Sequence, residues 1–337
     1  MKQKSLKIIL GTILTSLLII FTSCQKTPNF QTVSIRSAHS NWIEESFQTN
    51  IVNIGLEKLG YKVEKPKIID YQALYISVGN GDLDYSVIYY LPGHEKFFEN
   101  AGGEEKLEGV GNLTPNGNSG YQIDKKTADK YNITNIEQLK DPEIAKLFDS
   151  DGDGKANLVG CNPGWFCELI IDNQIEAYGL KDTVEHNRGQ YTILLADAIT
   201  RYQQGKSIIY YGYNPHWIYT VLTPGEDAIW LEVPFTSLPK SMGNLTEKDT
   251  SLDGKNLGFP LLQQHIVANK KFLEANPVAG KWFELVQIPV ADMNVESLRI
   301  KEGEDKPEDI MRHGQEWINN NQQKYDSWLE TAIKAAN

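Results

Sequence analysis

The alternation of short β-rich runs with helical runs, from Thr32 onward, is the feature that most constrains the fold. Apolar residues between Ile43 and Ile54 recur at intervals of three and four, which predicts a helix, and Gly60 ends it. The largely apolar run from Tyr85 to Tyr90 is typical of a strand that is covered on both faces. Such alternation predicts an α/β protein built on doubly wound sheets.

The length of the chain predicts two lobes. The roughly 310 residues of the mature chain exceed the size at which a single core keeps growing. A fresh β-then-α pattern starts at Gly120 to Lys126, and we place the return near Ala228 to Pro234. We therefore expect one lobe from residues 32–120 and 235–337 and the other from residues 121–234. Two crossings form a hinge.

The N-terminus is typical of an exported lipoprotein. Residues 1–23 form a secretory signal peptide, in which lysines precede an apolar run of about 14 residues, short of the roughly 20 that span a bilayer. The residues before Cys24 resemble a bacterial lipobox, so we expect lipidation of Cys24, a tether over 24–31, and a location in the periplasm or on the outer face of the cell membrane. The alternative is ordinary cleavage that leaves a free thiol.

The charge of the chain disfavours nucleic acid as a partner. The signal peptide carries three lysines and no acidic residue, so its removal lowers the formal net charge from −11 to −14. An acidic surface of this kind repels nucleic acid and anionic lipid.

A turn between Gly160 and Cys167 carries the strongest signal for a binding site. Pro163 and Gly164 force a tight turn before a helical run, so the first-turn amides of Phe166 and Cys167 are free to bind an anion such as a carboxylate. In an oxidising compartment Cys161 and Cys167 most simply form a disulfide. Trp165, within the same turn, is either a ligand contact or a core aromatic.

Three aromatic residues map to the edges of predicted strands or loops: Tyr90, Trp165 and Tyr213. Ligands of open α/β sheets lie outside the carboxyl ends of the strands, so these rings suggest a shared cleft. Ring faces attract a desolvated cation, and several rings together select a quaternary ammonium group.

From about Ser40 to the C-terminus the chain resembles the periplasmic glycine betaine/proline betaine-binding proteins of ProU-type ABC importers. The resemblance implies a two-lobed periplasmic-binding-protein fold of type II, with a mixed sheet and flanking helices in each lobe. The matching stretches are Glu44 to Thr49, Leu56 to Tyr61, Ile123 to Asp129, Gly160 to Trp165 and Ile288 to Asp292.

In that family three tryptophans surround the trimethylammonium group, while a histidine and backbone amides hold the carboxylate. The resemblance implies that Trp165 is one of the three, and that Tyr90 and Tyr213 stand at the other two positions. Tyrosine keeps a π face but is a weaker partner for a cation than tryptophan. His94 matches the histidine, and Phe166 and Cys167 match the amide donors.

The resemblance implies a monomeric binding protein, without cofactor or catalytic residues, that delivers a glycine betaine-type ligand to an ABC permease and its ATPase. Choline and dimethylsulfoniopropionate are alternative ligands. An extracytoplasmic enzyme is a less favoured alternative, because the chain has no nucleophile and base motif and no HExxH spacing. A sensory lipoprotein of the same fold is the third.

Two acidic patterns are interpreted as ordinary surface. Asp149, Asp151 and Asp153 match the start of an EF-hand loop, but Gly160 occupies the position of the bidentate glutamate, so we expect a polar turn and no metal site. The pair Glu44-Glu45 and the run Lys301 to Asp309 are interpreted as solvated charged faces.

Overall fold

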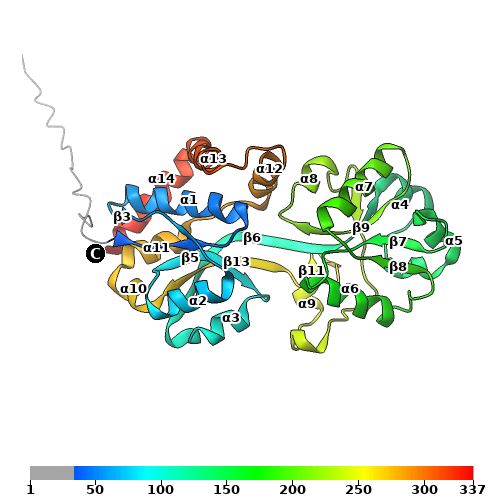
Figure 1. Cartoon of the computed structure of the whole chain (residues 1–337), viewed down its shortest axis with the longest axis horizontal. Helices are drawn as coiled ribbons and strands as arrows, with labels where there is room; N and C mark the ends of the chain where they lie inside the picture. Colours follow the sequence, from blue (N-terminus) through cyan, green and yellow to red (C-terminus); the bar gives the residue numbers. More distant parts are fainter. Residues whose placement is uncertain (1–33, 337) are drawn as a thin grey trace, which may run out of the picture.

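The computed structural model describes residues 34–336, which form two lobes connected by long strands (Figure 1). No helix within this range is long and apolar enough to cross a membrane. The predicted signal peptide, Cys24 and the tether lie outside the described residues.

The first lobe is built from both ends of the described chain. Its N-terminal elements are β1 (Ser34–Ile35), β2 (Ala38–His39), α1 (Ile43–Lys58), β3 (Lys62–Val63), β4 (Lys67–Ile68), α2 (Tyr71–Asn80), β5 (Tyr85–Leu91), α3 (Glu95–Asn100), the 3₁₀ turn η1 (Gly103–Glu105) and β6 (Leu107–Asp124). Its C-terminal elements are β13 (Leu262–Asn269), α10 (Lys270–Ala275), α11 (Pro277–Leu285), α12 (Val290–Lys301), α13 (Pro307–Asn320), α14 (Gln322–Ile333) and η5 (Lys334–Ala336).

The second lobe is the continuous segment between them. Its elements are α4 (Lys125–Tyr131), η2 (Ile136–Lys140), α5 (Pro142–Ala145), η3 (Lys146–Phe148), β7 (Ala156–Val159), α6 (Phe166–Ala177), β8 (Val184–Asn187), α7 (Tyr191–Gln203), β9 (Ile209–Asn214), α8 (Ile218–Val221), β10 (Ala228–Trp230), η4 (Lys240–Met242), α9 (Glu247–Thr250), β11 (Ser251–Leu252) and β12 (Lys255–Asn256).

One mixed sheet of seven strands runs through both lobes in the order β5-β13-β6-β9-β7-β8, with β10 also paired to β6. Strand β6 is 18 residues long. Its first part, Leu107 to Gly117, pairs antiparallel with β13, and the part from Asn118 pairs antiparallel with β9. In Figure 1, β6 crosses from one lobe to the other. The predicted α/β architecture is confirmed.

Two glycines explain how the first lobe packs. Gly81 follows α2 with φ of 79°, the left-handed conformation that commonly ends a helix. Gly55 lies in α1, where an added Cβ would come 2.2 Å from a ring atom of Trp282 on α11. The missing side chain therefore lets α1 and α11 approach closely, and the Trp282 indole N–H donates to the carbonyl of Val52 at 3.0 Å.

Each lobe has its own apolar core. The first combines residues 35–113 with residues 266–332, and the second spans Tyr121 to Phe259. Because Phe259 is fully buried in the second core, we propose that the chain returns to the first lobe near Leu262. The placement from sequence, Ala228 to Pro234, is earlier in the chain.

Helix α12 is a further connection between the lobes. Its Met293 belongs to the first core, whereas Leu298 packs against the second. Asn294 accepts a hydrogen bond from the His216 amide at 2.8 Å, and the Lys301 ammonium lies 4.1 Å from the centroid of the Trp217 ring. Helix α12 therefore lies with β6 and β13 in the region that connects the two lobes.

Candidate functional site

The second lobe presents an aromatic wall made by β9 and the start of α6. Trp165 immediately precedes α6, and Tyr213 lies near the end of β9. Their ring centroids are 6.2 Å apart and nearly perpendicular. Tyr191 and His216 pack against Tyr213 with centroid separations of 5.5 and 4.7 Å. The structure thus brings two of the three predicted aromatic residues together.

The turn before α6 has the geometry of an anion site. Cys161 and Cys167 are joined in a disulfide, and Gly164 has φ of 84°. Phe166 and Cys167 are the first two residues of α6, where backbone N–H groups have no partner within the helix and the helix dipole is positive. These two amides are therefore suited to bind a carboxylate.

The first lobe presents a second aromatic wall, around the end of β5. Tyr90 packs perpendicular to His94 at 5.1 Å between centroids, and Tyr71 from α2 packs on the same imidazole at 4.6 Å. The Nδ1 atom of His94 lies 2.9 Å from the carbonyl oxygen of Ile88. A carbonyl only accepts, so Nδ1 carries the proton. Burial lowers the pKa of His94 to about 4.

A buried carboxylate holds this wall in place. Glu45 on α1 is 0% exposed and accepts hydrogen bonds from the Tyr71 hydroxyl at 2.8 Å and the Tyr90 hydroxyl at 2.9 Å. The amide of Ser40 donates to its other oxygen at 2.8 Å. The prediction of a solvated face is therefore wrong for Glu45, because tyrosines from two distant segments cover it.

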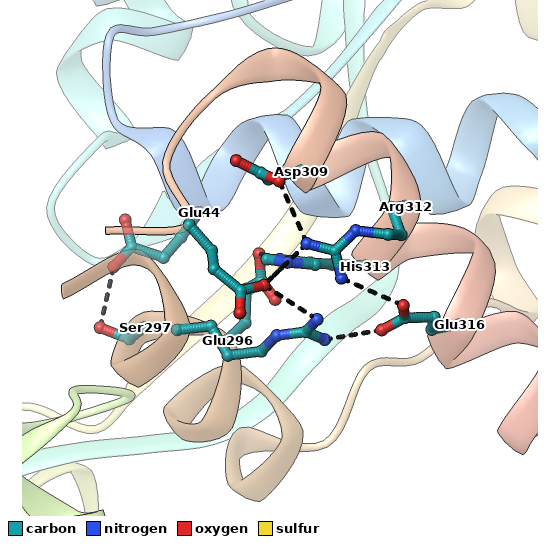
Figure 2. Close-up of polar contacts among 9 residues, drawn as sticks. Glu44, Glu296, Ser297, Asp309, Arg312, His313 and Glu316 are labelled. Atoms are coloured by element: carbon teal, nitrogen blue, oxygen red, sulfur yellow. Dashed lines mark hydrogen bonds and ion pairs between the residues drawn. The ribbon is translucent and has the colours of Figure 1, made fainter. Parts of the chain in front are cut away.

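Glu44, the neighbouring residue, reaches toward α12. Figure 2 shows its carboxylate accepting a hydrogen bond from Ser297, at 2.9 Å. Burial raises the pKa of Glu44. On another face of α12, Glu296 lies 2.9 Å from Nδ1 of His313, within the ion-pair cluster of Figure 2.

Two neighbouring hollows occupy the cleft between the walls. One has a volume of about 200 Å³ and is lined by both Tyr90 and Tyr213, from opposite lobes, as well as by Tyr71. The other, of about 510 Å³, is lined by Trp165. Residues that line both hollows are Trp42, Glu44, Tyr213 and Ser297.

Three predicted residues line neither of these hollows: His94, Phe166 and Cys167. Within residues 34–336, no hydrogen bond or ring contact joins Tyr90 or His94 to the start of α6. The two walls thus line the same cleft. In this arrangement, however, His94 of the first lobe does not adjoin the α6 amides of the second lobe, which are predicted to bind the same carboxylate.

Several residues that line the smaller hollow are not among the site residues predicted from the sequence. Trp42, 42% exposed, stands just before α1, and Tyr71 begins α2. Gln48 and Gln264 form a reciprocal pair of amide hydrogen bonds at 2.7 Å beside Tyr90. A large aromatic at the N-cap of a helix is a weak sequence signal for Trp42, while nothing in the sequence marks the two glutamines.

The EF-hand-like loop lies away from this cleft. Asp149, Asp151 and Asp153 each place one carboxylate oxygen within 4.8 Å of the others. The oxygens of Asp149 accept hydrogen bonds from the amides of Gly152 and Gly154 at 2.7 and 2.9 Å, which is the arrangement of a polar turn.

Comparisons with known proteins agree on one family. The model of the substrate-binding domain of ABC-type glycine betaine transport systems matches residues 33–320. A glycine betaine-binding periplasmic protein from Dickeya dadantii is 48% identical over 305 residues, which cover 90% of this chain and 91% of that protein. A glycine betaine/proline betaine-binding periplasmic protein from Escherichia coli is 46% identical over 304 residues, with the same two coverages.

Solved structures agree with the fold. A lactococcal protein in a closed conformation with glycine betaine has a TM-score of 0.58 at 19% identity, covering 88% of this chain and 99% of that one. A glycine betaine/L-proline-binding protein from Borrelia burgdorferi has a TM-score of 0.58 at 17% identity, covering 90% and 100%. The predicted type II periplasmic-binding-protein fold is confirmed.

Proposed function

Since the chain belongs to the family of substrate-binding domains of ABC-type glycine betaine transport systems, we propose that its interlobe cleft binds glycine betaine between the two aromatic walls. The chain is the substrate-binding protein of a glycine betaine ABC transporter. Tyr90, Trp165 and Tyr213 surround the trimethylammonium group. The amides of Phe166 and Cys167, together with His94, hold the carboxylate.

One observation carries this assignment of residues. Tyr90 and Tyr213 come from different lobes and line one small hollow. Trp165 borders the adjoining hollow at the positive end of α6. A cation site and an anion site within one cleft suit a zwitterion, because each charge then meets a complementary group as it loses water.

The periplasmic relatives support a location outside the cytoplasm. We place Cys24 as the lipid-bearing residue and regard the protein as an anchored monomer. It presents its ligand to the membrane permease and its ATPase. The ligand leaves unchanged, since binding and release are the whole activity that this proposal assigns; recovery of altered betaine after incubation with pure protein would contradict it.

Calorimetry on the mature protein tests the proposed site. We expect glycine betaine to bind far more tightly than choline, because choline leaves the carboxylate donors unpaired at about 1 to 3 kcal/mol per buried group. Trp165→Ala should lose most binding without lowering the thermal midpoint of the ligand-free protein. Tyr131→Ala, an exposed aromatic of the same lobe, is the control and should bind like wild type. Equal affinities for betaine and choline would show that the proposed anion site does not bind the carboxylate.

A further inference from the structure

Glu45 is a buried carboxylate without a cationic partner in the described chain. It is 0% exposed, and within residues 34–336 no lysine, arginine or histidine forms an ion pair with it. Its contacts are hydrogen bonds from the Ser40 amide, the Tyr71 hydroxyl and the Tyr90 hydroxyl. Burial of an ionised group is costly unless it is paired or hydrogen-bonded, and here three hydrogen bonds take the place of a cationic partner.

The two tyrosines connect this carboxylate to the smaller hollow. Each phenol binds Glu45 through its hydroxyl, and both Tyr71 and Tyr90 also line the hollow. A phenol that donates to a carboxylate gains electron density in its ring, which makes the ring a better partner for a cation. The charge of Glu45 also acts on the hollow directly, through an interior of lower dielectric than water.

We propose that Glu45 is a specificity-determining residue, the counter-charge of the bound quaternary ammonium group, and that it acts through Tyr71 and Tyr90. Tyr71 is accordingly a further wall of the cation site. This inference rests on the proposed function. It explains how tyrosine serves at position 90: the hydroxyl that tryptophan lacks is anchored to a negative charge.

Glu44 provides a matched comparison on the same helix. Its carboxylate borders both hollows, but it binds Ser297 and makes no hydrogen bond to either tyrosine. Glu44→Gln therefore removes one negative charge from the cleft without releasing a phenol. Glu45→Gln removes the charge that the two phenols share.

The test compares glycine betaine with 3,3-dimethylbutanoate, its isostere in which carbon replaces the charged nitrogen. In Glu45→Gln we expect the affinity for betaine to fall by about tenfold or more. The affinity for the isostere, which we would measure by displacement at high concentration, should change by less than about threefold. Glu44→Gln should lose less betaine affinity than Glu45→Gln. Equal losses for both ligands, or a larger loss in Glu44→Gln, would overturn the inference.

A double-mutant cycle gives a second readout that does not depend on the isostere. In a Tyr71→Phe, Tyr90→Phe background, Glu45→Gln should have much less effect on betaine affinity than in wild type, because the phenols that transmit the charge are gone. Additive effects would mean that Glu45 does not act through the two phenols, which would overturn the inference. Failure of wild type to bind betaine would refute the proposed function itself, whereas the other outcomes bear on Glu45 alone.

Discussion

Each lobe contributes a tyrosine followed closely by a histidine. Tyr90 packs on His94 and Tyr213 packs on His216, and in both cases burial lowers the histidine pKa, to about 4 and about 3 respectively. Both imidazoles are therefore neutral at pH 7. In His94 the proton lies on Nδ1, facing Ile88, which leaves Nε2 without a proton to donate.

This tautomer predicts that betaine binding takes up a proton. His94 donates to a carboxylate through Nε2 only after protonation, and the bound anion then raises its pKa. Calorimetry at pH 7 in buffers of different ionisation enthalpy should show uptake approaching one proton. Affinity should rise as pH falls from 7 toward about 4, by up to about tenfold per unit. His94→Gln should abolish the pH dependence, and wild-type binding without proton uptake would contradict this role.

The sequence pattern indicates the aromatic residues but not the carboxylate behind them. Tyr90 and Tyr213 stand at strand ends, where the local pattern already suggests a cleft. Glu45 is on a helix, and its burial depends on tyrosines 26 and 45 residues away in the chain. Helical periodicity does not indicate which distant side chains cover a given position, so a charged pair on a helix predicts a surface face.

At the scale of elements, α12 is the least expected feature. The contact of this helix with the second lobe depends on packing between distant parts of the chain. Asn294, 8% exposed, accepts a hydrogen bond from the amide of His216, and the His216 ring packs on Tyr213. Helix α12 thus connects the first core to the aromatic wall of the second lobe.

Asn294→Ala should lower the free energy of unfolding. The substitution leaves the buried His216 amide without an acceptor, which costs about 1 to 3 kcal/mol. Urea denaturation of the ligand-free protein measures this change. Val295→Ala, on an exposed position of the same helix, is the control and should stay within about 0.5 kcal/mol of wild type. Equal stability of the two variants would show that the contact between α12 and His216 contributes nothing.

At the scale of the whole molecule, the two lobes follow from length and alternating patterns, whereas the point of return does not. Strand β10 lies near the predicted crossing, yet it pairs with the C-terminal end of β6, in the second lobe. The chain then stays with the second lobe up to Phe259. The segment between β10 and β13 contains only short elements, so its place in a core is decided by long-range contacts. The crossing we propose near Leu262 rests on those contacts.

The separation of the two walls predicts that the lobes close on the ligand. Carboxylate donors at α6 and His94 both serve one small zwitterion only if the lobes approach each other, by bending at the connecting strands. Small-angle X-ray scattering should show a smaller radius of gyration at saturating glycine betaine. Glycine, which lacks the methyl groups, is the control ligand and should leave the radius unchanged. An unchanged radius with betaine bound would show that this arrangement already binds it.

The position of β13 sets the order in which the lobes are completed. It lies between β5 and β6 in the sheet, yet it follows the entire second lobe in sequence. The second core, Tyr121 to Phe259, is continuous and closes as soon as that segment is available. The first lobe begins earlier, but β5 and the first part of β6 lack their shared partner until Leu262 to Asn269 arrive. In a chain translocated from its N-terminus, the lobe that emerges first is therefore the last to receive all the strands of its sheet.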